Sequence, residues 1–203
     1  MISINNGVLT ATSLKLTIPH FELNSGDIIH LKGQSGSGKS LFLKSLCGQY
    51  PHHNYFINLE RIYYCPPLLQ LGERTFVEFI QEINQFSIFK TKNLTSNFKT
   101  FISERHQPEL INTPWHKLSN GQRQLVFFYF TLFLNPQVLL IDESFSFLDQ
   151  NLLKNVVDEV YDLHKKLITA VLFVSHHQAY LKPSKVYEII DQKLLLMKPV
   201  DNQ

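Results

Sequence analysis

The sequence is poor in cysteine, in net charge and in long hydrophobic runs, and each shortage excludes a class of protein. Its 203 residues include 2 cysteines, Cys47 and Cys65, which are too few for a disulfide framework. Both lie in apolar stretches, so we expect reduced core thiols of a cytosolic protein. The 19 Lys and Arg residues against 17 Asp and Glu leave a net charge of +2. Because this balance offers no basic face, we expect no nucleic-acid partner.

Long apolar runs are also missing. The longest nearly apolar stretch, residues 125–134, has about half the length of a membrane-spanning helix. The N-terminus lacks the basic start and the apolar run of a secretory signal. We therefore expect a soluble chain that reaches a membrane only through a partner. Hydrophobic residues nevertheless make up 44% of the sequence, and 16 residues are Phe, which is enough for the core of one domain.

Short apolar segments alternate with helical patterns, which predicts an α/β fold with a mostly parallel sheet. We expect strands at residues 8–18, 28–32, 61–65, 138–141 and 170–175, and a hairpin of residues 185–190 and 193–197. We expect helices at residues 40–47, 75–86, 121–134 and 151–167. The stretch 87–115 is polar and irregular, and the pattern predicts no regular element there.

A phosphate-binding pattern lies between the second predicted strand and the first predicted helix. Residues 33–40, GQSGSGKS, fit G-x-x-x-x-G-K-[ST]. The glycines let backbone N–H groups turn inward around a phosphate, and the helix adds the positive end of its dipole. Lys39 would reach the β- and γ-phosphates, and Ser40 would ligate Mg²⁺. The alternative, a chance Gly/Ser turn, does not explain the strand–loop–helix context. The predicted nucleotide-binding residues here are Gly33, Ser35, Gly36, Ser37, Gly38, Lys39 and Ser40.

An apolar strand that ends in two carboxylates comes later in the chain. Residues 138–143, VLLIDE, resemble a Walker B element. Asp142 would hold the metal through water, and Glu143 would orient or deprotonate the attacking water. The alternative interpretation is a strand that merely ends in solvated acidic residues. The phosphate-binding loop in the same chain argues against it.

Residues 118–122, LSNGQ, closely resemble the LSGGQ signature of ATP-binding-cassette (ABC) proteins. Residues 146–149, SFLD, resemble the D-loop of that family, and Ser175-His176 after an apolar strand resembles its switch-histidine loop. The resemblance runs over residues 14–196 with the motifs in the family's order. It implies one ABC ATPase domain over residues 1–203, a P-loop NTPase with a mostly parallel sheet. A small N-terminal antiparallel β region and a helical subdomain at about residues 68–135 would complete the domain.

The resemblance also implies a head-to-tail dimer, of like or unlike cassettes, with two ATP molecules at its interface. Ser119, Gly121 and Gln122 of one subunit would face the ATP held by the other. His176 would contact the γ-phosphate and position Glu143, while Asp149 would carry information across the interface. The resemblance thus implies ATP and Mg²⁺ as cofactors and Lys39, Glu143 and His176 as catalytic residues.

Four departures from the family pattern stand out. Pro67 replaces the Gln that ligates Mg²⁺, which makes Gln70, three residues on, a candidate substitute beside Ser40 and Asp142. The alternative is that Ser40, Asp142 and water hold the metal without it. Residues 7–18 contain no aromatic to stack on adenine. Asn120 replaces a signature glycine, although Asn tolerates left-handed backbone. The helix after the signature is bulky at residues 127–130, FFYF, which we interpret as a repacked core.

The leading hypothesis is the ATP-hydrolysing subunit of an ABC membrane transporter, docked on membrane subunits through residues 67–115 at the cytoplasmic face. The short chain indicates a minimal subunit without a regulatory domain. Two alternatives remain open: a degenerate or regulatory cassette with weak hydrolysis, which Pro67 favours, and a non-transport ABC ATPase of a soluble complex. The transported substrate and the direction of transport are not specified by the sequence.

Overall fold

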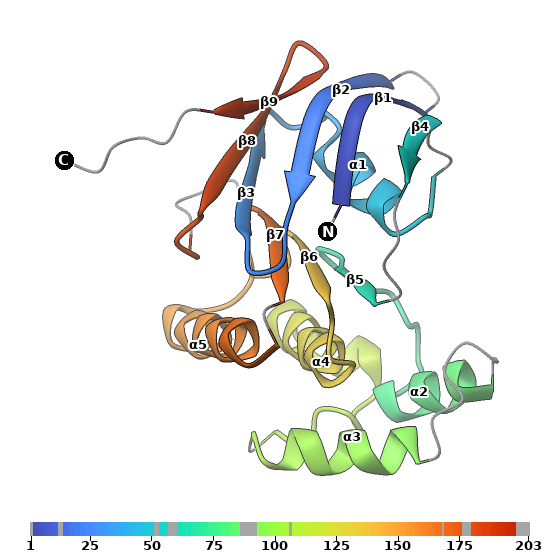
Figure 1. Ribbon diagram of the computed structural model, residues 1–203. Helices are drawn as coiled ribbons and strands as arrows, with labels where there is room; N and C mark the ends of the chain where they lie inside the picture. The colour runs from blue at the N-terminus through green and yellow to red at the C-terminus, as the bar shows by residue number, and fades with distance from the viewer. Residues whose placement is uncertain are drawn as a thin grey trace.

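A nine-stranded sheet flanked by helices forms the molecule in the computed structural model (Figure 1). The structure describes residues 2–11, 14–50, 53–56, 61–85, 93–105, 107–167, 169–175 and 180–197, and of residues 53–56 only the backbone. The strands are β1 (Ile2–Ala11), β2 (Leu14–Leu23), β3 (Ile28–Gly33), β4 (His53–Phe56), β5 (Ile62–Cys65), β6 (Val138–Asp142), β7 (Ala170–Val174), β8 (Lys185–Ile190) and β9 (Lys193–Met197). The helices are α1 (Lys39–Leu46), α2 (Phe76–Gln85), α3 (Leu94–Ser103), α4 (Asn120–Phe133) and α5 (Gln150–Leu167), with a 3₁₀ turn at Trp115–Lys117.

The sheet combines a parallel body with an antiparallel region. Its strand order is β4-β1-β2-β9-β8-β3-β7-β6-β5. Strands β8, β3, β7, β6 and β5 pair in parallel. Strands β1, β2 and β4 pair antiparallel, and β9 returns antiparallel along β8. The predicted fold class, a mostly parallel sheet with a small N-terminal antiparallel region, is confirmed.

Two apolar cores lie on opposite faces of the parallel strands, because successive side chains in a strand point to opposite faces. Within β6, Val138 and Leu140 pack with α1 and the N-terminal strands, whereas Leu139 and Ile141 pack with α4 and α5. Strand β7 divides in the same way. Every residue of β6 and β7 is buried, as expected of strands covered on both faces.

Aromatic packing holds the helical lobe of α2, α3 and α4 together (Figure 1). The buried Phe76 ring stands 5.6 Å from Trp115, 5.9 Å from Phe98 and 5.4 Å from Phe130, measured between ring centres. Each such pair adds about 1 kcal/mol beyond its buried area. Phe128, Tyr129 and Phe130 are buried, so the bulky helix is a repacked core, as interpreted from the sequence.

Two local predictions were wrong. The predicted strand 8–18 is a hairpin of two strands, with Ala11 opposite Leu14. Leu9 and Leu16 are cross-strand partners on the same buried face, and no Gly or Pro in the sequence between them signals a reversal. The second error is helix α3, inside the segment predicted to be irregular. Its buried residues are Leu94, Phe98 and Ile102, spaced four apart, and the partly buried Phe101 packs beside them.

A buried histidine in β3 gives the fold a dependence on pH. The His30 ring is 2% exposed and stacks on Phe173 with 4.5 Å between ring centres. Burial lowers the pKa of His30 below its usual 6.5, against the raising effect of a hydrogen bond to the Ser175 backbone, and Lys32 lowers it further. The charged form is therefore disfavoured in the folded chain.

We expect acid to destabilise the protein through His30. As pH falls below about 6.5, the unfolded chain takes up the proton first, so the free energy of unfolding declines by up to about 1.4 kcal/mol per pH unit. Thermal unfolding followed by circular dichroism at about pH 7.5 and about pH 5.5 measures this loss. A His30→Phe variant should lose less between the two conditions. A His20→Gln variant, changed at an exposed histidine, should keep the wild-type loss. Equal losses in His30→Phe and wild type would contradict the assignment.

Candidate functional site

The phosphate-binding loop lies between β3 and α1, as predicted. Gly38 is the N-cap of α1, with φ 104°, and makes no side-chain cap to the helix. This positive φ favours glycine, and a Cβ atom at position 38 would also displace the Leu14 side chain, whose Cδ2 would stand 2.6 Å away. The first-turn N–H groups of α1 consequently face the loop without a side-chain acceptor, the arrangement that binds phosphate at helix N-termini.

Lys39 lies folded over this loop. Its ammonium donates to the carbonyl oxygens of Gly33 at 2.8 Å and Gln34 at 2.9 Å, and the residue is 6% exposed. Burial lowers the pKa of Lys39, while the charges of Glu143 and Asp142 oppose that shift. The cation of the loop and both predicted carboxylates therefore belong to one electrostatic site.

Asp142 ends β6 and is 1% exposed. The Tyr64 hydroxyl donates to its Oδ2 atom at 2.6 Å. Burial, followed by this bond, raises the pKa of Tyr64, so the phenol keeps its proton and remains the donor. The second oxygen, Oδ1, is buried without a hydrogen-bond partner in the described part of the chain.

The donor set fits Mg²⁺. An orphaned buried carboxylate oxygen needs a cation or a water, and hard oxygen ligands are those Mg²⁺ prefers. Ser40, in the first turn of α1, is exposed and offers its hydroxyl. When bound, the ion would neutralise charge on the phosphates. Gln70 is exposed beyond β5, and its role as a ligand stays a prediction.

Glu143 follows Asp142 at the point where the chain leaves the sheet. Its φ of 54° is unusual for a non-glycine residue, and such backbone often marks functional positions. The Glu143 N–H donates to the Val174 carbonyl at 3.3 Å, which ties the turn to β7. The half-buried carboxylate is thereby placed beyond Asp142 at the same sheet edge.

The signature segment begins α4 through a capping box. The Ser119 hydroxyl accepts from the Gln122 N–H at 3.2 Å, and the Ser119 N–H donates to Gln122 Oε1 at 2.9 Å. At Gly121 an added Cβ would approach the Phe147 carbonyl oxygen to 2.8 Å, so this glycine lets the D-loop pack on the helix. Gln122 thus has a structural role that the sequence analysis missed, although Ser119-x-x-Gln122 is the spacing typical of a capping box.

Asp149 caps the next helix. Its Oδ1 atom accepts from the N–H groups of Asn151 and Leu152, each at 2.9 Å, at the start of α5. The carboxylate is exposed, and its predicted role across a dimer interface stays a prediction. Between the two loops, the large apolar side chain of Phe147 is 55% exposed.

Two polar side chains that sequence reasoning missed hold the loop around Pro67. Gln124 is a buried residue of α4, and its Nε2 atom donates to the Pro67 carbonyl oxygen at 2.7 Å. The Ser144 hydroxyl donates to the Cys65 carbonyl at 2.6 Å and lies 3.0 Å from that of Pro66. Only the tertiary contact identifies these residues, because isolated Gln and Ser carry no sequence signal. Both cysteines are free; Cys65 is buried as predicted, whereas Cys47 is half-buried. Burial raises the pKa of each thiol to about 12.

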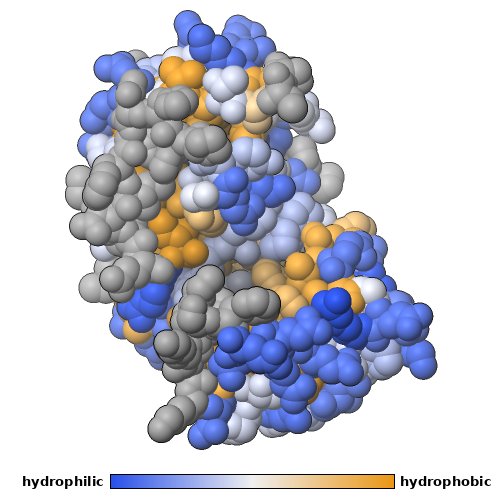
Figure 2. Space-filling view, turned by 90° about the vertical axis from the view of Figure 1, so that its right-hand side faces the viewer, coloured by the Kyte–Doolittle hydropathy of each residue, from blue (hydrophilic) through white to orange (hydrophobic). Residues whose placement is uncertain are grey.

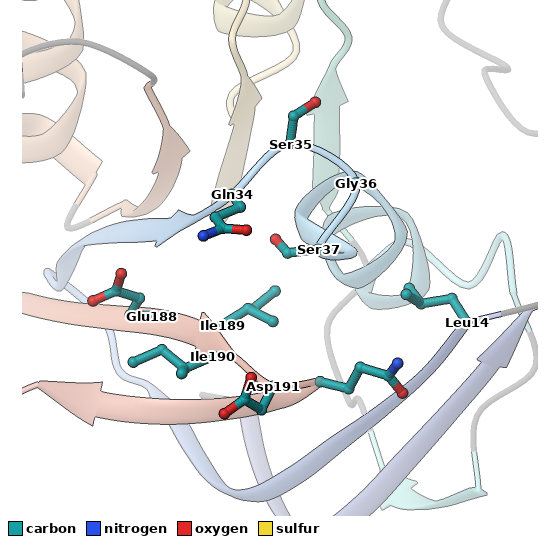
Figure 3. Close-up of a pocket in the computed structure, with 10 residues that line it drawn as sticks. Leu14, Gln34, Ser35, Gly36, Ser37, Glu188, Ile189, Ile190 and Asp191 are labelled. Atoms are coloured by element: carbon teal, nitrogen blue, oxygen red, sulfur yellow. The ribbon is translucent and has the colours of Figure 1, made fainter.

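A pocket of about 500 Å³ adjoins the phosphate-binding loop (Figure 3). Figure 3 shows it between that loop and the β8–β9 hairpin, with Leu14 at one end and Glu188 at the other. The residues that line it are Leu14, Gln34, Ser35, Gly36, Ser37, Glu188, Ile189, Ile190, Asp191 and Gln192. Inside the loop the buried Ser37 hydroxyl makes no hydrogen bond to the described residues.

The structure brings together residues 33–40, Asp142 and Glu143, and it puts the signature on a separate helix, α4. His176 lies outside the described residues, and so do the neighbouring residues 177–179. Ser175, directly before it, follows β7 and is half-buried.

The model of the ABC transporter family matches residues 16–146, more than half of the chain. The chain belongs to this family. It is an ABC nucleotide-binding subunit, and its P-loop NTPase fold is that of the family's ATPase cassettes. The cassette is 29% identical over 185 residues to the methionine import ATP-binding protein MetN of Clostridioides difficile, covering 79% of this chain and 56% of MetN.

A second relative is the zinc import ATP-binding protein ZnuC of Yersinia pestis, 29% identical over 171 residues, covering 83% of this chain and 66% of ZnuC. The cassette thus spans less than two thirds of each of these relatives. Among solved structures, a dimeric bacterial ABC transporter cassette superposes with a TM-score of 0.76 at 18% identity, covering 96% of both chains. No helix within the described residues is long and apolar enough to cross a membrane.

Proposed function

We propose that this cassette is the ATP-binding and ATP-hydrolysing subunit of a membrane transporter, and that ATP-driven closure of a cassette dimer energises transport. The observation that carries the proposal is the polar site at the sheet edge, where the register of β3, β7 and β6 brings the phosphate-binding loop near Asp142. There, the phosphate-binding loop with Lys39 shares an electrostatic environment with Asp142 and Glu143. Members of the family are ATPases coupled to transport, which supports the same conclusion.

Each residue of the site has a separate task in this proposal. Lys39 exchanges its bonds to loop carbonyls for the β- and γ-phosphates, so its charge is used only when nucleotide binds. Asp142 and Ser40 hold Mg²⁺. Glu143 orients the attacking water and accepts its proton. We also assign the γ-phosphate contact to His176, as the family resemblance implies.

The second half of the ATP site comes from a second cassette, identical or different. Ser119, Gly121 and the start of α4 face the γ-phosphate across the interface, where the helix N-terminus offers another positive dipole end. Gln122 keeps the signature loop in shape through the capping box, and Asp149 relays contacts between the sites. The dimeric cassette with the same fold supports this arrangement.

The membrane partner docks on residues 67–115 in this proposal. Figure 2 shows the side of the molecule that carries β5 and α2, where the surface is hollowed between the β part and the helical lobe. Leu68 and Leu69, which follow β5 in the chain, are only half-buried. The cassette would then lie at the cytoplasmic face of the membrane as one domain with a helical subdomain at about residues 68–135. Relatives named for methionine and zinc import do not specify its substrate.

A regulatory cassette with weak hydrolysis is the second candidate, and Pro67 favours it. Proline offers no side-chain ligand for Mg²⁺, and its carbonyl is already bonded to Gln124. In this version the cassette binds ATP and closes on a more active partner.

The nucleoside of ATP lies in the pocket beside the loop in this proposal. Leu14, Ile189 and Ile190 supply an apolar surface for the base, and the carboxylates of Glu188 and Asp191 accept from donors on the ribose or base. Leu14 also packs over Gly38, so the proposed site of the base would directly adjoin the phosphate-binding loop. An aliphatic residue in place of a stacking aromatic makes base selectivity weak.

We expect the Glu143→Gln protein to dimerise only with Mg-ATP, because it retains binding but hydrolyses slowly. Light scattering should report a mass of 23.6 kDa without nucleotide and about twice that with it. Adding Lys39→Ala should abolish ATP binding, while adding Ser119→Arg should leave binding intact and prevent closure. An unaltered dimer in the Ser119→Arg background would contradict the signature assignment.

We expect the cassette to copurify with a membrane-spanning protein from detergent-solubilised membranes. Leu68→Glu should remove most of that partner while ATP binding is retained, since a charge replaces an apolar contact. Leu167→Glu, changed at a 48% exposed leucine at the end of α5, serves as the control. A wild-type cassette found only in soluble complexes would count against a transport role.

We expect Leu14→Trp to tighten ATP binding by about tenfold, because stacking a base on an aromatic ring is worth about 1–3 kcal/mol. Isothermal titration with ATP, GTP and inorganic triphosphate measures the effect. Affinity for inorganic triphosphate should not change, which separates the nucleoside pocket from the phosphate site. Leu167→Trp controls for an added tryptophan. If Leu14→Trp leaves ATP affinity unchanged, the nucleoside binds elsewhere.

A further inference from the structure

The two oxygen atoms of Asp142 have different environments. Oδ2 accepts the Tyr64 hydroxyl at 2.6 Å, the length of a charge-assisted O–H···O⁻ bond. Oδ1 is equally enclosed but makes no hydrogen bond to the described residues. Oδ2 is therefore bonded within the protein, whereas Oδ1 is available to a ligand of the site.

The sheet explains why Tyr64 can reach Asp142. Strands β5 and β6 run parallel with Tyr64 opposite Leu140, two residues before Asp142. Adjacent strands are about 4.8 Å apart, so a long side chain leaning along its strand spans that offset. Helix α1 also contacts the Tyr64 ring, because Lys44 Nζ lies over it at 5.9 Å from the ring centre. The ring is thus held between the helix of the phosphate loop and the strand of the carboxylate.

We propose that Tyr64 is a positioning residue, which fixes the Asp142 carboxylate so that Oδ1 faces the divalent cation of the bound nucleotide. This rests on the proposed function, because the cation arrives with ATP. The hydrogen bond to one oxygen restrains rotation of the carboxylate, so the other oxygen is preorganised for the ion or its water.

The loop after β5 makes this positioning more important in this chain. Pro67 has no side-chain oxygen, and its carbonyl oxygen is used by Gln124. Because position 67 supplies no side-chain ligand, the geometry of Asp142 carries a larger share of the binding. Nothing in the apolar pattern of residues 62–65, IYYC, distinguishes Tyr64 from its neighbour Tyr63.

The test compares Tyr64→Phe with Tyr63→Phe. Phe keeps the ring beside Lys44 and removes only the hydroxyl, whereas Tyr63 points to the other face of the strand. Mn²⁺, which electron paramagnetic resonance detects directly, replaces Mg²⁺ in a titration of full-length protein saturated with ATP. Loss of such an outer hydrogen bond costs about 10–100-fold in metal affinity, so Tyr64→Phe should bind Mn²⁺ that much more weakly. Tyr63→Phe should bind as wild type does.

Two further measurements separate positioning from folding. ATP affinity in excess chelator should be the same in Tyr64→Phe and wild type, since phosphate contacts do not involve the hydroxyl. Raising the Mn²⁺ concentration should restore the turnover of Tyr64→Phe, which a folding defect would not allow. If Tyr64→Phe is less stable, the same titrations at low temperature on folded protein give the answer. Unchanged Mn²⁺ affinity in Tyr64→Phe overturns the positioning role, whereas wild-type protein that binds no Mn²⁺-ATP overturns the proposed function instead.

Discussion

The parallel pairing of β3, β7, β6 and β5 is the constraint on which the site depends. In its register Leu31 lies beside Val174 and Val174 beside Asp142, so the carboxyl ends of three strands reach one edge together. Each strand then leads into one part of the site: the phosphate loop after β3, Glu143 after β6 and Ser175 after β7. A shift of β6 by one residue against its neighbours would turn Asp142 to the opposite face. The apolar strands therefore position a small cluster of polar residues.

The polar groups of the site are buried at this sheet edge, and their hydrogen bonds compensate them only in part. Asp142 and Lys39 lie where charges are costly, and each is compensated only in part, by Tyr64 and by loop carbonyls respectively. The Asp142 Oδ1 and Ser37 hydroxyl atoms remain without hydrogen bonds in the described part of the chain. Folding tolerates such groups where a ligand completes them, since each orphan costs about 1–3 kcal/mol. The large cores on both faces of the sheet therefore offset the cost of preorganising the site for nucleotide.

Local chemistry decided which parts of this structure could be predicted from the sequence. The phosphate loop, β6 and the β8–β9 hairpin combine a motif or turn signal with an unbroken apolar pattern, and all lie where expected. Helix α3 and strand β4 do not combine such a signal with an unbroken apolar pattern. Tyr64, Gln124 and Ser144 could not be identified, because their importance arises from hydrogen bonds to residues 57 to 79 positions away. Such contacts exist only once the sheet has formed.

The loop after β5 shows how one replacement redistributes function. Proline at position 67 removes an amide side chain, yet the loop keeps a fixed path because Gln124 and Ser144 hold its carbonyls from α4 and from the turn after Glu143. The same turn continues into the D-loop, whose Phe147 N–H lies 3.4 Å from Gln124 Oε1. Gln124 therefore contacts both the loop beside the proposed docking surface and the loop at the proposed dimer face. A displacement of one loop therefore changes the hydrogen bond that Gln124 offers to the other.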